Sequence, residues 1–112
     1  MLAMLMGVKN ISPNDLHARL GADGPAVFDL NAAHSWQAAR VPGARSLGVD
    51  FDAGALPQDQ AAPLVFYCSN PLCSKAPRAA KRAGKLGYKD VRVMSAGITG
   101  WMAAQLPVDS GT

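Results

Sequence analysis

Several features that would assign a chain to a class at once are missing from this sequence. Only two of its 112 residues are cysteines, five positions apart, which is too few for the disulfide framework of a small secreted protein. No apolar run approaches the roughly 20 residues of a membrane-spanning helix. The opening MLAMLMGV has neither a basic segment nor a small-residue cleavage site, so it does not resemble a signal peptide. We therefore expect a cytoplasmic protein with no membrane partner.

Glutamate is absent, and all eight acidic residues are aspartates, against eleven lysines and arginines. Aromatic residues make up 6% of the chain and are not interleaved with the basic ones, which disfavours a nucleic-acid partner. His17 and His34 have no partners at ligand spacing, which disfavours a metal site. Seven basic residues gather in one segment, where only Asp90 opposes them: Lys75, Arg78, Lys81, Arg82, Lys85, Lys89 and Arg92. This segment is either a solvated helix face or a field that attracts small anions or an acidic partner.

The length of 112 residues and the hydrophobic content of 49% suit one domain over residues 1–112, with 1–7 as a frayed start and 108–112 as a tail. Strand and helix patterns alternate along the chain. The expected strands lie near residues 8–11 and at 26–30, 46–49, 64–67 and 88–94, and the expected helices at 13–20, 34–40, 74–87 and 97–106. Such alternation predicts an α/β fold in which a central parallel sheet of about five strands carries helices on both faces.

The helix at residues 74–87 has the clearest pattern. Its alanines recur at helical spacing, so we expect them to pack closely against the sheet together with Leu86. These alanines are Ala76, Ala79, Ala80 and Ala83. Pro77 is tolerated only within the first helical turn, where its missing donor costs nothing, so the helix should begin near Cys73 or Ser74.

Cys68 lies between the apolar strand at residues 64–67 and this helix. In open α/β sheets, ligands bind where loops leave the carboxyl ends of strands. Loop N–H groups and the positive end of the helix would both favour a thiolate. Lowering a thiol pKa from about 8.5 to about 6 requires roughly 3.4 kcal/mol, and a helix end supplies about 2 at most, so N–H bonds to the sulfur must supply the rest. The alternative is that Cys68 is a small hydrophobic residue buried at a strand end.

Three stretches in this order resemble the rhodanese-like sulfurtransferases: VFDL followed by VPGA at residues 41–44, FYCSNPLCS around Cys68, and SAGITGWMAAQLPV near the C-terminus. The resemblance covers nearly the whole chain and implies a single-domain, rhodanese-like fold. It implies that Cys68 is the nucleophile and takes a sulfane sulfur from thiosulfate, a polysulfide or another persulfide donor. The resulting persulfide would pass its outer sulfur to cyanide or to an acceptor thiol, which could belong to a protein. No metal or organic cofactor is implied.

The resemblance also implies that the residues after Cys68 form the substrate-binding loop: Ser69, Asn70, Pro71, Leu72, Cys73 and Ser74. The N–H groups of all of them except Pro71 would surround the outer sulfur. Pro71 removes a donor, and Cys73 stands where the family often has arginine, so thiosulfate should be a poor donor. Related phosphatases have arginine six residues after the cysteine, and here that residue is Ser74. The loop therefore disfavours a phosphatase.

Other departures from the family concern the first strand. The family often has Asp-Val-Arg at the end of this strand, where this chain has Asp29, Leu30 and Asn31. The glutamate that usually follows is absent, with Ser35 near its place. Arg40 stands where the family commonly has a histidine. An arginine–glutamate structural pair is therefore expected to be missing.

Cys73 has three interpretations: a neutral loop residue, a thiol that resolves a persulfide on Cys68, or the partner of Cys68 in a dithiol redox switch. Lys75 and Arg78 are the candidates for attracting an anionic donor. Asp29 either bonds or positions a group near the site or is purely structural, and Trp36 and Trp101 are expected to pack in the core. Three functions therefore stay open: a sulfurtransferase, a sensor of redox state or sulfane sulfur, and a non-catalytic interaction domain, against which the retained cysteine argues.

Overall fold

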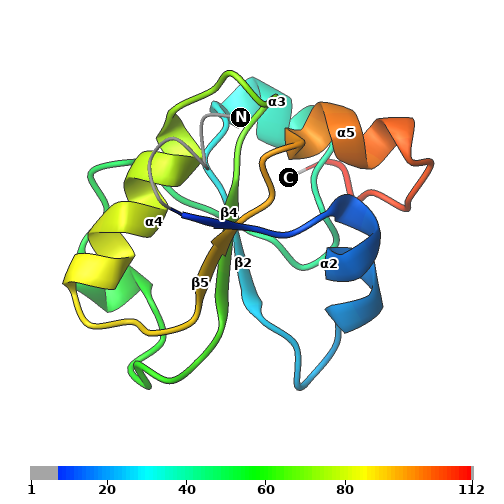
Figure 1. Ribbon diagram of the computed structural model, residues 1–112. Coiled ribbons are helices and arrows are strands. Elements are labelled where there is room, and N and C mark those ends of the chain that lie inside the picture. The colour runs from blue at the N-terminus through cyan, green and yellow to red at the C-terminus, as the bar shows by residue number, and fades with distance from the viewer. Residues whose placement is uncertain (1–7, 112) are drawn as a thin grey trace.

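A five-stranded parallel sheet forms the centre of the computed structural model, which describes residues 8–111 (Figure 1). The strands run in the order β1-β5-β4-β2-β3, and every pairing is parallel. The strands are β1 (Lys9–Asn10), β2 (Ala26–Asp29), β3 (Arg45–Ser46), β4 (Leu64–Tyr67) and β5 (Val91–Val93). The helices are α2 (Pro13–Arg19), α3 (Ala33–Ala38), α4 (Lys75–Lys85) and α5 (Gly97–Ala103), with a 3₁₀ turn at Ala53–Ala55. The predicted α/β fold with about five parallel strands is confirmed.

Helices cover both faces of the sheet, with α4 on one face and α2 and α5 on the other (Figure 1). Successive side chains of a strand point to opposite faces, so β4 contributes to two cores. Leu64 and Phe66 pack in the core under α4, whereas Val65 and Tyr67 pack in the core under α2 and α5. Cys68 continues the first of these two series, so its side chain belongs to the face that α4 covers.

The alanine face of α4 packs against the sheet as predicted. Ala76, Ala79, Ala80 and Ala83 are each exposed by 2% or less, whereas Leu86 ends the helix with 37% of its surface exposed, so its expected burial is wrong. Small side chains bring the helix axis close to the strands. This close approach fixes the position of the first turn of α4 relative to the end of β4.

The start of α2 also follows the prediction. Ser12 caps the helix, its hydroxyl oxygen accepting the N–H of Asp15 at 3.1 Å, and Pro13 occupies the first helical position. Trp101 of α5 is fully buried and donates its indole N–H to the carbonyl oxygen of Pro107 at 2.8 Å. Trp36 is half-buried, and the guanidinium of Arg40 lies 4.2 Å from the centre of its ring.

A buried hydrogen-bond chain joins β2 to β4. The hydroxyl of Tyr67 donates to the carboxylate of Asp29 at 2.6 Å and accepts the N–H of Val41 at 3.0 Å. The other carboxylate oxygen of Asp29 accepts the N–H of Asn31 at 2.7 Å. Burial raises the pKa of Asp29, although these hydrogen bonds oppose the rise. These hydrogen bonds could not be predicted from the sequence, because they depend on the strand register that sets Asp29 beside Tyr67.

Residues 109 and 111, within the predicted tail at 108–112, are hydrogen-bonded to the rest of the domain, and Thr112 lies outside the described residues. Arg40 and Asp109 exchange two backbone hydrogen bonds at 2.9 and 3.0 Å, and the N–H of Gly111 donates to the carbonyl oxygen of Gln37. The predicted frayed start at residues 1–7 lies outside the described residues. No helix within residues 8–111 is both long and apolar enough to cross a membrane.

Candidate active site

The loop after β4 sets Cys68 against the amino end of α4. Strand β4 ends at Tyr67, and α4 begins at Lys75 with Ser74 as its first flanking residue, as expected. The carbonyl oxygen of Cys68 accepts the N–H of Ile98 at 2.9 Å, and that of Ser69 accepts the N–H of Thr99 at 3.1 Å. The first turn of α5 therefore fixes the backbone of Cys68 and Ser69, and with it the position of the Cys68 sulfur.

The middle of the loop turns around Asn70. Its carbonyl oxygen accepts the N–H of Cys73 at 3.1 Å, and its side-chain oxygen accepts the N–H of Leu72 at 2.9 Å. The prediction that these two N–H groups surround a sulfur is therefore wrong. The Leu72 side chain is 87% exposed at the tip of this turn. The tight turn has a second effect, which is to bring Cys73 back toward Cys68.

Three backbone N–H groups reach the two sulfurs. Those of Ser69 and Ala76 interact with the sulfur of Cys68, and those of Ser69 and Lys75 interact with the sulfur of Cys73. Lys75 and Ala76 are the first residues of α4, whose N–H groups have no partner within the helix. The N–H of Ser69 therefore lies near the cysteine sulfurs, and its predicted contact with an outer sulfur stays a prediction, whereas the contribution of Lys75 and Ala76 was missed. The signal was available, because the position of Pro77 already indicated where the first turn lies.

The two thiols also interact with each other. Both cysteines are free, and the sulfur of Cys68 lies 3.7 Å from the carbonyl oxygen of Cys73, to which its S–H donates. Cys68 is only 3% exposed, whereas Cys73 is half-buried. Cys68 is therefore the buried thiol of the pair, and Cys73 is the more accessible one.

Burial, together with the neighbouring Cys73 thiol, raises the pKa of the Cys68 thiol to about 12, because the N–H groups of Ala76 and Ser69 offset only part of the rise. This result contradicts the expectation of a low pKa at Cys68. Burial also acts against ionisation of Cys73, but the hydrogen bond from Cys68 and the N–H groups of Lys75 and Ser69 outweigh it and lower the Cys73 pKa. Because the thiols are in contact, one negative charge belongs to the pair and is held first at Cys73.

We expect alkylation to follow this order. As the pH rises, iodoacetamide should modify Cys73 first, at a pH below the ordinary value for a thiol, because only its thiolate forms there. Cys68 should react at higher pH, and Cys73→Ser should lower its apparent pKa by removing the hydrogen bond and the charge that oppose its ionisation. Rates measured against pH by peptide mass spectrometry test this. Faster modification of Cys68 at every pH would contradict it.

A cavity of about 10 Å³ adjoins the two sulfurs. Its lining comes from the loop, the first turn of α4 and the end of β5: Cys68, Asn70, Pro71, Cys73, Ala76, Pro77, Val93, Met94 and Ser95. A space of about 10–15 Å³ is what a single water-sized atom needs. The closed loop therefore has room for about one atom beyond the cysteine sulfurs, and a larger donor must react at its rim or open it.

The other predicted auxiliary residues lie at different distances from this cavity. Asp29 points to the opposite face of the sheet, where it binds Tyr67, so it does not contact the loop. The side chains of Lys75 and Arg78 are exposed on α4. Arg78 lines a groove beside Asp50 on the outer side of the helix. The positive charges of Lys75 and Arg78 therefore lie outside the cavity beside Cys68.

Gly97 is a functional position that sequence reasoning did not single out. It has a positive φ of 68°, and a Cβ atom there would lie 2.5 Å from the carbonyl carbon of Ser69. Glycine thus permits the close contact between α5 and the cysteine loop. Ser95 precedes it and donates its N–H and hydroxyl to the side-chain oxygen of Asn10, at 2.9 and 2.6 Å.

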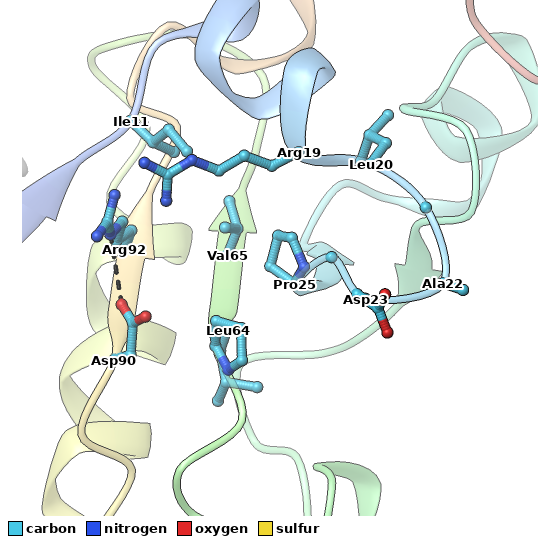
Figure 2. A pocket seen from close by; sticks show the side chains of 13 residues that line it. Ile11, Arg19, Leu20, Ala22, Asp23, Pro25, Leu64, Val65, Asp90 and Arg92 are labelled. Atoms are coloured by element: carbon cyan, nitrogen blue, oxygen red, sulfur yellow. Dashed lines mark hydrogen bonds and ion pairs between the residues drawn. The ribbon is translucent and has the colours of Figure 1, made fainter.

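A much larger cavity, of about 480 Å³, lies at the amino ends of the strands (Figure 2). Its lining includes the segment between α2 and β2, the start of β4, and the ion pair of Arg92 with Asp90 at 3.3 Å. It shares no lining residue with the cavity beside Cys68. Size alone therefore does not locate the chemistry in this fold. Within residues 8–111, no three metal-ligating side chains gather to hold a metal ion.

Comparison with known families matches residues 12–104 to the model of the rhodanese-like domain. No match was found among curated proteins. Among solved structures, BH2092 of Bacillus halodurans superposes with a TM-score of 0.81 at 22% identity, over 96% of this chain and 80% of that one.

One further structure is described by an activity, and another as a protein of unknown function with a possible activity. A thiosulfate sulfurtransferase of Pseudomonas aeruginosa superposes with a TM-score of 0.81 at 28% identity, over 93% of this chain and 20% of that one. RPA3614 of Rhodopseudomonas palustris, described as a possible tyrosine phosphatase, gives a TM-score of 0.75 at 23% identity, over 96% of this chain and 89% of that one. Proteins of this shape thus carry different descriptions, and the loop chemistry has to distinguish them.

Proposed function

Because this chain belongs to the rhodanese-like domain family, we propose that it is a sulfurtransferase that carries a sulfane sulfur as a persulfide on Cys68. One observation carries the proposal. The sulfur of Cys68 lies at the carboxyl end of a central strand, in contact with the N–H groups of Ser69 and Ala76 and beside a cavity of about one atom. Such a cavity suits the outer sulfur of a persulfide.

Loading begins with a thiolate at Cys68. The pair loses its first proton from Cys73. The S–H of Cys68, which donates to the carbonyl oxygen of Cys73, then turns to the Cys73 thiolate and gives it the proton. The Cys68 thiolate attacks the sulfane sulfur of the donor, and the donor's S–S bond breaks. Thiosulfate would release sulfite, and a persulfide or polysulfide would release the shorter thiolate or sulfide. The product is the Cys68 persulfide anion, stabilised by the N–H groups of Ser69 and Ala76.

Transfer reverses the roles of the sulfurs. An acceptor thiolate or cyanide attacks the outer sulfur, and the electrons of the breaking S–S bond return to Cys68 as a thiolate. Cyanide becomes thiocyanate, and a thiol becomes a persulfide. The described side chains supply every group that these steps require from the protein, so the proposal needs no metal or organic cofactor. A reducing compartment such as the cytoplasm would keep both thiols free for the reaction.

Donor preference follows from the loop. Thiosulfate carries a bulky dianionic group, and the nearby cations, Lys75 and Arg78, lie on the exposed surface of α4 rather than in the cavity. Without an arginine fork, the sulfonate has no matched partner. We therefore expect an inorganic polysulfide to be a better donor than thiosulfate.

Thiocyanate formation from cyanide, measured with each donor in turn, tests the proposed function. Repeated turnover with either donor supports it, and about tenfold faster turnover with polysulfide supports the stated preference, equivalent to about 1.4 kcal/mol in the barrier. Stoichiometric modification without turnover would favour a sensor of sulfane sulfur instead. That second candidate rests on the contact between the thiols and on the closed loop.

Phosphate-ester hydrolysis finds no such support. The cavity beside Cys68 holds about one atom, and Ser74 occupies the position at which phosphatases on this fold need arginine. A phosphoryl group has three non-bridging oxygens to bind, which matches neither feature.

A further inference from the structure

Cys73 stands where it can react with a persulfide on Cys68. The S–H of Cys68 donates to the carbonyl oxygen of Cys73 at 3.7 Å, and both cysteines line the cavity that would hold the outer sulfur. This approach is built by the loop, because the turn around Asn70 folds the six residues 68–73 into a tight arc. The pair is therefore a property of the backbone and not a chance approach of two flexible side chains.

The surroundings of Cys73 suit an attacking thiolate. Its sulfur interacts with the N–H groups of Ser69 and Lys75 and with the side chain of Ser69. Hydrogen bonds of this kind stabilise a thiolate, and the N–H of Lys75 comes from the positive end of α4. The pKa of Cys73 is lowered accordingly. Cys68, at 3% exposure, is much less accessible to thiols from solution than it is to Cys73.

We propose that Cys73 resolves the persulfide on Cys68 and releases hydrosulfide, an activity that rests on the proposed function. The proton that Cys73 took from Cys68 during loading passes to the outer sulfur, which leaves Cys73 as a thiolate. The Cys73 thiolate attacks the inner sulfur, a Cys68–Cys73 disulfide forms, and the bond to the outer sulfur breaks. The outer sulfur leaves as HS⁻ with the electron pair of that bond. The two cysteine sulfurs are oxidised, and the sulfane sulfur, which serves as the oxidant, is reduced to sulfide. No further oxidant is needed.

This step competes with transfer to an outside acceptor. A reaction between neighbouring groups in one molecule has an effective concentration far above that of any thiol in solution, of the order of 10⁵ M or more when the groups are well oriented. A good acceptor must therefore reach the persulfide before Cys73 attacks it. Without an acceptor, the protein converts sulfane sulfur to sulfide and stops as the disulfide. An external thiol must then reduce that disulfide by exchange before the next cycle.

Attack on the outer sulfur is the chemical alternative. It would move the persulfide from Cys68 to Cys73 and release nothing. The structure favours attack on the inner sulfur, because the outer sulfur would lie in the cavity beside Cys68, whereas the Cys68 sulfur lies 3.7 Å from the carbonyl oxygen of Cys73. Bridging also requires Cα atoms within about 7 Å, and the tight turn over residues 70–73 brings the two cysteines toward each other.

The test compares wild type, Cys73→Ser and Cys68→Ser after reduction, removal of thiols and exposure to one equivalent of inorganic polysulfide. Hydrosulfide, free thiols and intact mass are measured with no acceptor present. Wild type should release hydrosulfide, lose both thiols and end as a disulfide. Cys73→Ser should keep the added sulfur and release at least tenfold less hydrosulfide. Cys68→Ser should gain no stable sulfur.

Each other result contradicts the proposal in a different way. If wild type keeps a persulfide on Cys68 as Cys73→Ser does, resolution is wrong and the proposed function stands. A persulfide found on Cys73 in wild type would replace resolution by transfer between the cysteines. If Cys73→Ser gains no sulfur and wild type neither gains sulfur nor releases hydrosulfide, both the resolution and the proposed function fail. Circular dichroism and a Cys73→Ala variant check that the result does not come from misfolding.

Discussion

Replacing Cys68 by serine should abolish sulfur transfer. We expect thiocyanate formation from polysulfide to fall by a factor on the order of 10³ or more, because removal of a covalent nucleophile eliminates the intermediate rather than weakening it. A serine hydroxyl is not ionised at neutral pH and forms no persulfide. The exchange changes little of the packing, since serine is slightly smaller and can bond the same N–H groups.

The matched control for this change is Cys73→Ser, which alters the neighbouring sulfur by the same chemical step. It should keep transfer to cyanide above the pH at which Cys68 ionises without the Cys73 base, because the persulfide forms on Cys68 and is no longer diverted to the disulfide. Chemical denaturation of both variants should give unfolding free energies within about 2 kcal/mol of wild type. Transfer that survives in Cys68→Ser while Cys73→Ser is inactive would assign the nucleophile to the wrong cysteine.

Gly97→Ala should be the most damaging small substitution outside the cysteine loop. Its φ of 68° costs a non-glycine residue about 1–2 kcal/mol, and the new Cβ would meet the backbone of Ser69 and Asn70 at 2.5–2.7 Å. Backbone cannot yield as a side chain does, so overpacking adds about 1–3 kcal/mol. We expect a total loss of about 3 kcal/mol in the free energy of unfolding, together with a shift of the loop and a large loss of sulfur transfer.

Gly43→Ala separates the two causes. Gly43 has a similar φ of 79°, but nothing lies within 4 Å of the position its Cβ would take. This variant should show only the conformational cost, about 1–2 kcal/mol, and unchanged transfer. Equal losses of stability in both variants, measured by urea unfolding, would show that contact with the loop contributes nothing at Gly97.

The sequence was informative wherever one residue fixes one local structure. Ser12 and Pro13 marked the start of α2, and Pro77 located the first turn of α4 within a residue or two. The alanine series identified the buried face of that helix, and the alternation of elements determined the class of the fold. These signals are short-range, so they can be read without knowing what packs against them.

The chemistry of the site depended on longer-range facts. The sequence could not show that Asn70 binds the N–H groups of Leu72 and Cys73, or that Ala76 and Lys75 provide donors in their place. It could not show the depth of Cys68, which decides the direction of its pKa. Asp29 was placed on the correct strand, but the register directs it to Tyr67 on the opposite face.

The ionisation of the nucleophile Cys68 differs from the expectation. A helix end and a few N–H groups were expected to keep Cys68 ionised by themselves. The structure instead pairs a buried thiol with a more exposed one whose pKa is lowered, so that the two share one charge. The two cysteines therefore react as a pair. Cys68 holds the added sulfur, whereas Cys73 controls the ionisation of Cys68 and the removal of the persulfide.

Intact-mass measurement on Cys73→Ser, after brief exposure to polysulfide and removal of the excess, decides whether Cys68 carries the sulfur. Cys68 is then the only thiol in the chain. We expect a gain equal to the mass of one sulfur atom, on the peptide that contains Cys68, which cyanide removes as thiocyanate. A folded variant whose mass stays unchanged at every donor concentration and pH would contradict the assignment of the persulfide to Cys68.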